Sequence, residues 1–490
     1  MPTINIDGED YVVDDGLNIV QACAQAGIEV PHFCYHPGLK ADGNCRMCLT
    51  EMEVAPDRWV LVTSCTTPAN RDGTKIRTTT PPVLDNRKGI MEFLLINHPL
   101  DCPWCDQAGE CRLQNYSFDH GRSQSRYVED KRVPPKKDLG SHITLFSTRC
   151  ILCQRCTRFC DQVPGTSELG VTKMGSRSEI DIHPDRPLEN PMSGNVADIC
   201  PVGALVTKDF LYKPRIWHYD KVNTVCTGCS TGCNTLLEVM DHKIYRTRPR
   251  ENMDVNTFWM CDDGRFLYNE WQDLDRFKSP MERVDGELVP ISWTEALARV
   301  GEHIVSTDSA DSSASVALVG SAAMTNEENY LLRRLGDQSL KDAARGLYRR
   351  PDGEEWVAKS GFRIEADKSA NARGAAEMLG VSDMKQVIDG IQAGTVKTVY
   401  FLNGDTHCSL TSEEQETLGK LDLLIVQDVA PSALTALAHI VLPGASPFEK
   451  DGTVTNVAGR VQRLRKAFPP PGGAQQDTDV IRQIAQLLDV

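Results

Sequence analysis

The sequence predicts an α+β protein of several domains, and three observations support this fold class. Its 490 residues correspond to about three or more domains at the usual roughly 100–200 residues per domain. Seventeen of the eighteen cysteines stand at or before Cys261, so a cysteine-rich front precedes an ordinary back. In the back, strand signals alternate with helix signals, which predicts a parallel sheet.

Composition excludes some classes of function. The formal net charge of −15 argues against nucleic acid as the main partner, because phosphate binding needs an excess of clustered lysine and arginine. No apolar run approaches the ~18–20 residues of a membrane helix, and the first ten residues lack the features of a signal peptide. We therefore expect a cytoplasmic protein, in which eighteen cysteines favour metal or redox use over disulfides.

The front begins with short strand signals around one helix, which predicts a small β-rich domain over residues 1–80. The expected front elements are strands at 3–7 and 11–13, a helix through Leu17, Val20 and Ala24, a second helix at 85–97 and a basic surface loop at 121–142. In the back, the capping boxes Thr325-x-x-Glu328 and Thr411-x-x-Glu414 each predict a helix start. The expected back elements are strands at 316–319, 396–402, 423–426 and 440–442, and flexible loops at 307–315 and 469–473.

The first cysteine group is Cys34-x10-Cys45-x2-Cys48-x16-Cys65. Iron–sulfur clusters need several thiolates in tight loops whose backbone N–H groups face the sulfides, and Gly43 allows such a loop before Cys45. A zinc site shares the C-x2-C element, but the uneven outer spacings favour a [2Fe–2S] cluster. We interpret Cys23, on the helix, as a core thiol.

The second group is His98-x3-Cys102-x2-Cys105-x5-Cys111. Its spacing alone is equally compatible with a cluster and with a structural zinc knuckle, in which His98 could be a bystander.

The third group is the bacterial ferredoxin run Cys150-x2-Cys153-x2-Cys156-x3-Cys160, followed downstream by Cys200-Pro201. In two-cluster ferredoxins the fourth cysteine of the run serves a second cluster, whose other ligands precede the distant Cys-Pro at fixed offsets. Those offsets hold Asn190, Ser193 and Val196 here. We therefore expect one [4Fe–4S] cluster, on Cys150, Cys153, Cys156 and Cys200, and interpret Cys160 as a free thiol.

The fourth group is Cys226-x2-Cys229-x3-Cys233-x27-Cys261, for which a zinc ribbon is the alternative to a cluster. The chain contains neither G-x-G-x-x-G nor G-x-x-x-x-G-K-[ST]. A dinucleotide or nucleoside triphosphate site on this chain therefore lacks support, and we expect another polypeptide to bind any pyridine nucleotide.

The front resembles a known family. The string Glu92-Phe-Leu-Leu-Ile-Asn-His-Pro-Leu-Asp-Cys-Pro-Trp-Cys-Asp-Gln is very close to a signature of the large iron–sulfur subunit of bacterial proton-pumping NADH:quinone oxidoreductase, respiratory complex I. The resemblance implies that His98 is a cluster ligand. It implies one [2Fe–2S] and two [4Fe–4S] clusters, and a third [4Fe–4S] cluster on the Cys226 group that only some members carry.

Residues 219 onward resemble the molybdopterin oxidoreductase fold, through Leu442-Pro-Gly-Ala and Glu449-Lys-Asp-Gly-Thr-Val-Thr-Asn-Val-Ala-Gly-Arg-Val-Gln. Active relatives such as formate dehydrogenase carry lysine where this chain has Asp263, and the back is shorter than that fold's usual extent. We therefore expect no molybdenum cofactor and a truncated α/β domain. The resulting domains are a β-grasp ferredoxin domain at 1–80, [4Fe–4S] modules at 81–121 and 140–215, and molybdopterin-oxidoreductase-like regions at 219–275 and 276–490.

The resemblance implies an electron-transfer subunit of NADH:quinone oxidoreductase with no catalytic residue and no bond-making chemistry of its own. The implied partners are a flavin-bearing NADH-oxidising subunit with its small [2Fe–2S] partner, and quinone-side iron–sulfur subunits. The implied location is the peripheral arm on the cytoplasmic face of the inner membrane, which the chain touches only through the complex. The alternatives are an iron–sulfur subunit of an NAD-linked formate dehydrogenase or hydrogenase, and a zinc-bound scaffold.

Overall fold

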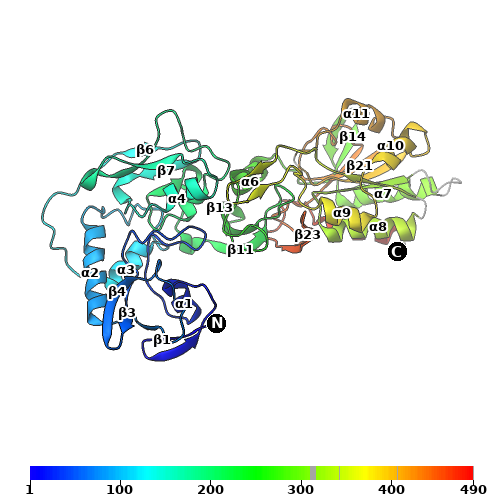
Figure 1. Ribbon diagram of the computed structural model, residues 1–490. Helices are drawn as coiled ribbons and strands as arrows, with labels where there is room; N and C mark the ends of the chain where they lie inside the picture. The colour runs from blue at the N-terminus through cyan, green and yellow to red at the C-terminus, as the bar shows by residue number, and fades with distance from the viewer. Residues whose placement is uncertain (309–315, 341–342, 406, 489–490) are drawn as a thin grey trace. The chain divides into compact units, whose positions relative to one another are not determined.

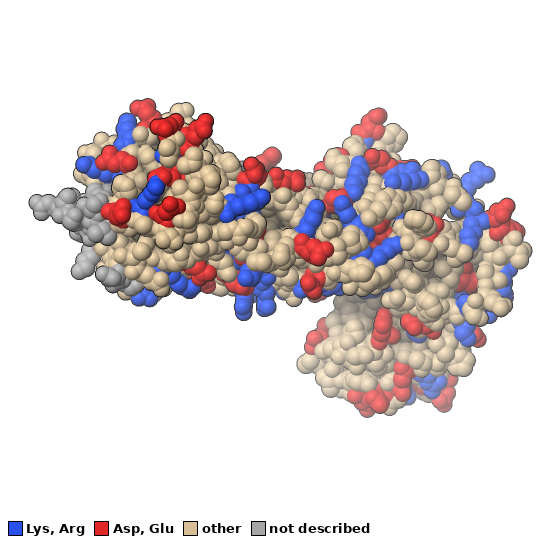
Figure 2. Space-filling view, turned by 180° about the vertical axis from the view of Figure 1, so that it is seen from behind, with Lys and Arg blue, Asp and Glu red and all other residues tan. Residues whose placement is uncertain are grey.

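The computed structural model describes residues 1–308, 316–340, 343–405 and 407–488. The chain divides into two compact units (Figure 1). The first unit contains residues 1–218 and 358–362, and the second contains residues 219–357 and 363–490. On the face that Figure 2 shows, lysine and arginine side chains are interspersed with aspartate and glutamate. No helix in the described ranges is both long enough and apolar enough to cross a membrane.

The first unit begins with a five-stranded mixed sheet in the order β2-β1-β5-β3-β4, which confirms the β-rich N-terminal domain. Its elements are β1 (Thr3–Ile6), β2 (Glu9–Val12), α1 (Ile19–Gln25), β3 (Leu49–Ala55), β4 (Arg58–Thr63) and β5 (Lys75–Arg77). Asn18 starts α1 with a capping box that includes Gln21. The helix buries Ile19, Val20, Ala22 and Cys23 against the sheet, so Cys23 is a core thiol as expected.

The rest of the first unit consists of short elements joined by loops. They are α2 (Pro81–Leu95), α3 (Arg112–His120), β6 (Lys136–Asp138), β7 (Ile143–Phe146), α4 (Arg155–Gln162), β8 (Leu169–Thr172), β9 (Glu179–Ile182), α5 (Asn195–Asp198) and β10 (Leu205–Thr207). The helix expected from residue 85 begins at Pro81, because proline is tolerated in the first turn, where its missing N–H is not needed. The loop expected at 121–142 is interrupted by β6, which pairs with β7.

The second unit begins with an antiparallel sheet in the order β11-β12-β13, followed by a helix. These elements are β11 (Asp220–Val225), β12 (Asn234–Met240), β13 (Lys243–Pro249) and α6 (Asp262–Asp273). Leu237, Val239 and Ile244 of the sheet share one buried apolar cluster with Tyr268 and Trp271 of α6. The helix starts directly after Cys261, which is its N-cap.

A seven-stranded sheet organises the remainder, in the order β15-β14-β22-β21-β20-β16-β17. Its strands are β14 (Met281–Val284), β15 (Glu287–Pro290), β16 (Val316–Ser321), β17 (Ala344–Tyr348), β20 (Thr398–Leu402), β21 (Leu423–Asp428) and β22 (Ile440–Pro443). The five strands from β22 to β17 are parallel, which confirms the parallel sheet, whereas β14 and β15 form an antiparallel edge.

The helices of this region are α7 (Trp293–Asp308), α8 (Asn326–Ser339), α9 (Ala372–Leu379), α10 (Lys385–Gln392), α11 (Ser412–Leu418) and α12 (Asp477–Leu487). Short two-stranded ribbons are formed by β18 (Trp356–Val357) with β19 (Arg363–Ile364) and by β23 (Gly452–Thr455) with β24 (Val461–Leu464). Both predicted capping boxes are present, at the starts of α8 and α11. The loop expected at 307–315 begins after Asp308, and its residues 309–315 lie outside the described part of the chain.

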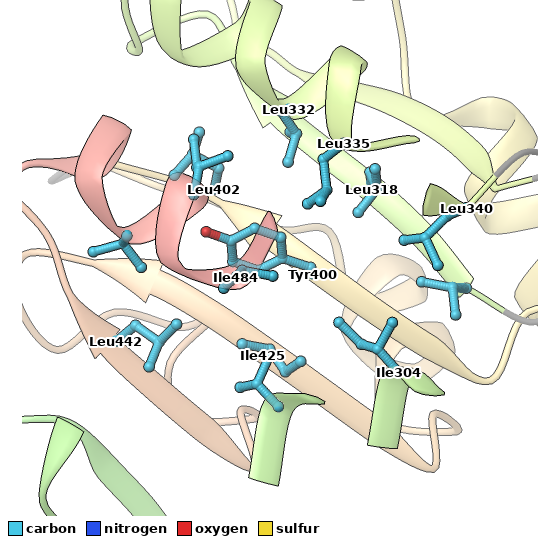
Figure 3. Packing of buried hydrophobic residues seen from close by; sticks show 14 of the residues in the cluster. Ile304, Leu318, Leu332, Leu335, Leu340, Tyr400, Leu402, Ile425, Leu442 and Ile484 are labelled. Carbon is cyan, nitrogen blue, oxygen red and sulfur yellow. The ribbon is translucent and has the colours of Figure 1, made fainter. Parts of the chain in front are cut away.

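Hydrophobic clusters cover both faces of the parallel sheet. Tyr400 and Leu402 of β20 point into one cluster, with Leu332 of α8 and Ile484 of α12 (Figure 3). The intervening Phe401 points into the other cluster, which includes residues of α10. Because successive side chains of a strand point to opposite faces, one uninterrupted apolar run serves both clusters.

Charged side chains are also buried at the carboxyl ends of the parallel strands. The Nζ of Lys450 lies 3.1 Å from a carboxylate oxygen of Glu328 and 3.1 Å from one of Asp477, and all three side chains are almost fully buried. Asp428, at the end of β21, accepts hydrogen bonds from the amide of Asn403 and the hydroxyl of Ser432. Burial raises the pKa of Asp428 to about 7.

We predict that Asp428 makes the stability of the second unit depend on pH. Its folded-state pKa lies above the unfolded value, so between about pH 4 and pH 7 unfolding releases a proton and stability falls as pH rises. The Asp428→Asn variant should lose this dependence, and its free energy of unfolding should gain on that of wild type by at most about 1.4 kcal/mol per pH unit in this window. Urea unfolding across a pH series measures the difference, with the exposed Glu416→Gln as control. Parallel pH profiles of Asp428→Asn and wild type would contradict the assignment.

Candidate metal centres

The four cysteines of the first group converge at one place beside the N-terminal sheet. The thiol of Cys34 is in hydrogen-bond contact with Cys45 and Cys65, and Cys65 is also in contact with Cys48. The backbone N–H of Cys34 points at the sulfur of Cys45, at 3.4 Å. Three members are buried, and Cys45 is partly exposed.

These contacts link the thiols of the first group by hydrogen bonds, so that the pKa of each thiol depends on its neighbours. Hydrogen bonds from Cys45 and Cys65 lower the pKa of Cys34, and the same bonds raise the pKa values of the two donors. The arrangement therefore favours negative charge on Cys34 over its two neighbours. A cationic metal centre that replaces those protons satisfies all the sulfurs together, which fits the [2Fe–2S] ligand set.

The second group follows α2, and His98 is its most informative member. The Nδ1 atom of His98 is buried and has no hydrogen-bond partner in the described residues. Burial lowers the pKa of His98 to about 4, so its imidazole is neutral and keeps a lone pair. A neutral imidazole with a buried, unpartnered nitrogen is suited to metal ligation, so the residue fits the ligand role better than the bystander role.

The three cysteines of the second group lie within electrostatic range of one another. Negative charge on Cys102 or Cys105 would raise the pKa of Cys111, and negative charge on Cys102 would raise the pKa of Cys105. Cys102 is exposed, whereas Cys105 and Cys111 are partly buried. Burial raises the pKa of Cys111 to about 11, so this thiol keeps its proton until a metal displaces it.

Glycine at position 203 allows the backbone to approach Cys105. A Cβ atom built on Gly203 would lie 2.2 Å from the sulfur of Cys105, far closer than atoms can approach. Gly203 comes shortly after Cys200 of the third group, so the loop of one group packs directly on a sulfur of another. This glycine escaped sequence reasoning, although a glycine three residues after Cys200 is a visible signal.

We therefore predict that Gly203→Ala displaces Cys105 and impairs the second centre. Iron content should fall by about four atoms per chain, with loss of one [4Fe–4S] signal in EPR of the reduced protein. Gly170→Ala is the matched control, since a Cβ atom there meets nothing within 4 Å. A Gly203→Ala protein with the iron content and spectrum of wild type would refute this packing argument.

The third group brings Cys150, Cys153, Cys156 and Cys200 together. Desolvation raises the pKa values of all four cysteines. Negative charge on the other three further raises the pKa of Cys156, which stands at the start of α4. Backbone N–H groups face the sulfurs: Leu152 donates to Cys150 at 3.4 Å, and Val202, Ala204 and Leu205 are directed at Cys200. Such donors stabilise the thiolates of a cluster.

Three residues stand where two-cluster ferredoxins have the cysteine ligands of their second cluster, and all three are buried. Asn190, Ser193 and Val196 are at most 4% exposed. Glu168 accepts hydrogen bonds from the backbone N–H and the side-chain amide of Asn190, and its charge helps to raise the pKa of Cys160 to about 12 after burial. Cys160 is thus a protonated thiol beside a carboxylate.

We predict that Cys160→Ser leaves every cluster in place, whereas Cys200→Ser removes the cluster of the third group. The reason is that Cys160 faces Glu168, and an anionic neighbour opposes ligation by thiolate. EPR of the two reduced variants decides between the two cysteines. Loss of a [4Fe–4S] signal in Cys160→Ser, with retention in Cys200→Ser, would assign the ligand the other way.

The fourth group lies in the second unit, between β11 and α6. Cys233 and Cys261 are buried and Cys226 is partly buried. Desolvation, and then the charges of neighbouring cysteines of the group, raise the pKa values of all three. Cys261 is the N-cap of α6 and accepts a hydrogen bond from Gly264 at 3.3 Å. A Cβ atom on Gly264 would lie 2.8 Å from the sulfur of Cys226, so glycine is required here too.

Asp263 stands beside this fourth group. Its negative charge raises the pKa values of both Cys226 and Cys261, after the larger effect of burial. Asp263 therefore opposes additional negative charge at the fourth group. A cationic side chain at this position would have the opposite effect.

The second and third groups of the first unit share a cavity. Its volume is about 180 Å³, and both His98 and Cys150 line it. Arg132 and Glu179 also line it, and they form an ion pair with each other. Together with the contact of Gly203 on Cys105, this cavity makes the two groups neighbours.

Among the described residues, no set of three His, Cys, Asp or Glu side chains has the arrangement for a single metal ion.

Five family models match successive parts of the chain. They are a 2Fe-2S iron-sulfur cluster binding domain (residues 1–81), the NADH-ubiquinone oxidoreductase-G iron-sulfur binding region (87–126), the ferredoxin-like domain of NADH-quinone oxidoreductase subunit 3 (140–206), the molybdopterin oxidoreductase Fe4S4 domain (219–273) and molybdopterin oxidoreductase (276–345 and 349–487).

The chain is 32% identical to the NADH-quinone oxidoreductase G-type subunit of Rickettsia conorii, over all of this chain and 88% of that protein. It is 40% identical to the G-type subunit of Rickettsia felis, over 68% of this chain and 49% of that protein. It is 42% identical to the mitochondrial NADH dehydrogenase (ubiquinone) iron-sulfur protein 1 of Solanum tuberosum, over 61% of this chain and 40% of that protein. A solved NAD+-reducing [NiFe]-hydrogenase matches 44% of this chain and 91% of its own at 26% identity, with a TM-score of 0.40.

Proposed function

The chain belongs to the family of G-type iron–sulfur subunits of NADH-quinone oxidoreductase, and on this premise we propose which of its residues carry electrons and which partners it serves. As a member of that family it is an iron–sulfur electron-transfer subunit of an oxidoreductase complex. Iron–sulfur clusters accept and release electrons, and the protein sets their potentials through ligands, burial and hydrogen bonds.

We assign one [2Fe–2S] cluster and three [4Fe–4S] clusters to the four ligand groups. The ligand sets are Cys34, Cys45, Cys48 and Cys65 for the [2Fe–2S] cluster; His98, Cys102, Cys105 and Cys111; Cys150, Cys153, Cys156 and Cys200; and Cys226, Cys229, Cys233 and Cys261. The observation that carries the electron-transfer role is the cavity lined by both His98 and Cys150, since it makes the second and third ligand groups neighbours within one compact unit. Adjacent groups of this kind suit stepwise electron transfer.

The proposed direction runs from a flavin-bearing subunit that oxidises NADH, with its small [2Fe–2S] partner, to quinone-side iron–sulfur subunits. The missing glycine-rich phosphate loop supports a separate nucleotide-binding partner. We place the chain in the peripheral arm on the cytoplasmic face of the inner membrane, joined to the membrane only through the complex.

We further propose that the second unit holds no molybdenum cofactor and serves as a scaffold. Asp263 supports this, because a carboxylate beside the Cys226 group cannot act as a cationic relay to a pterin. In the same scheme the domain boundaries are 1–80, 81–121, 140–215, 219–275 and 276–490, with one ligand group in each of the first four.

The chain purified anaerobically by itself should contain about fourteen irons, little zinc and no molybdenum. Once its partners are restored, it should support NADH-dependent quinone reduction. Alone, it should neither oxidise NADH nor turn over formate. Metal analysis, EPR and an NADH–quinone assay measure these properties. Cys105→Ala should abolish one cluster signal and the quinone reductase activity, while Cys408→Ala, which alters a buried cysteine of the back, should preserve both.

Two results would overturn the proposed function. Stoichiometric zinc with little iron would favour a zinc-bound scaffold. Stoichiometric molybdenum with formate turnover by the pure chain would favour the formate dehydrogenase alternative.

A further inference from the structure

Two arginines of α4 join the first ligand group to the third. The guanidinium of Arg155 donates to the carbonyl of Tyr35, the residue after Cys34, and to the carbonyl of Ile199, the residue before Cys200, the latter at 3.1 Å. One side chain therefore contacts the immediate neighbours of a ligand in each group.

Arg158, one turn further along α4, makes a second link. Its Nη2 donates to the carbonyl of Cys34 and lies 3.4 Å from the carbonyl of Cys153. Its Nη1 donates to the carbonyl of Lys40 at 2.7 Å. A single nitrogen thus contacts the backbone of a ligand from both groups, which sets the spacing between them.

The burial of Arg155 requires a compensating charge. Its side chain is 5% exposed, its hydrogen bonds go to carbonyls, and no salt bridge to it exists in the described part of the chain. Burying a cation without an anionic partner is unfavourable. The two carbonyls that accept hydrogen bonds from Arg155 belong to the direct chain neighbours of Cys34 and Cys200, which are ligands of two different groups.

Metal-bound thiolates are the anions that this arginine lacks. When both ligand groups are deprotonated and loaded, negative charge lies on two sides of the guanidinium, and each added electron increases it. A cation at that position favours the reduced form of each centre and raises both potentials. Because Arg158 is partly exposed, water screens its charge more, and its effect should be smaller.

We propose that Arg155 and Arg158 are positioning residues that hold the [2Fe–2S] centre of the Cys34 group against the [4Fe–4S] centre of the Cys150 group and raise the redox potentials of both. This inference rests on the cluster assignment of the proposed function. If the arginines only held the two groups together, their hydrogen bonds would matter and their positive charge would not. A variant that keeps an N–H donor but loses the charge would then leave the redox potentials unchanged, whereas our proposal predicts that both potentials fall.

The test compares neutral and charged variants in the complete complex by EPR-monitored redox titration. Arg155→Gln should lower the midpoint potentials of both centres, by an amount equivalent to about tenfold in each redox equilibrium, or 59 mV for a one-electron couple. Arg155→Lys, which keeps the charge, should restore values close to wild type. Arg158→Gln should lower both potentials by less.

Arg87→Gln is the matched control. Arg87 is also a buried arginine, but its strongest electrostatic neighbour is Cys48 of the first group, and it lies on α2 rather than α4. Its loss should lower the potential of the [2Fe–2S] centre alone. If Arg87→Gln lowers both potentials equally, the effect is not specific to α4 and the inference fails.

Unchanged potentials of both centres in a loaded Arg155→Gln protein would overturn the inference. If Arg155→Gln does not assemble its clusters, Arg158→Gln decides: a lowering of both potentials supports the inference, and wild-type values overturn it. Failure of the proposed function is separately visible, because a wild-type complex without iron or without EPR signals would contradict the cluster assignment itself.

Discussion

The constraint on which the first unit depends is that a buried thiol keeps its proton unless hydrogen bonds, as at Cys34, or a metal cation stabilise the thiolate. Burial raises the pKa of Cys150 to about 12 and that of Cys153 to about 11. The surrounding fold therefore supplies hydrogen-bond donors and positive charge that stabilise thiolates. Backbone N–H groups face the sulfurs of Cys150 and Cys200, and α4 contributes Arg155 beside them.

The same constraint explains why the loops pack as closely as they do. A ligand group works only if its sulfurs are held at the right distances before the metal arrives, and short loops without long helices give that control. Gly203 and Gly264 show how tight the packing is, since a single added carbon on either residue would collide with a ligand sulfur.

The second unit is built on a different principle. Its parallel sheet is covered on both faces by apolar side chains, and its buried charges are paired, as in the contacts of Lys450 with Glu328 and Asp477. Its cysteine group lies at the start of α6, outside the seven-stranded sheet, where Asp263 adds a negative charge.

Local sequence signals determined much of this protein. Cysteine spacing predicted the four ligand groups, capping boxes located the starts of α8 and α11, and apolar runs predicted the parallel strands, because each of these depends on residues near one another in the chain. Only the tertiary structure decided which groups are neighbours. The shared cavity of His98 and Cys150, the packing of Gly203 on Cys105, and the contacts of α4 with the first group join residues about 50 to 120 positions apart, and no local pattern encodes such distances. Spacing specifies which side chains can bind a metal, whereas packing specifies how the bound centres are arranged.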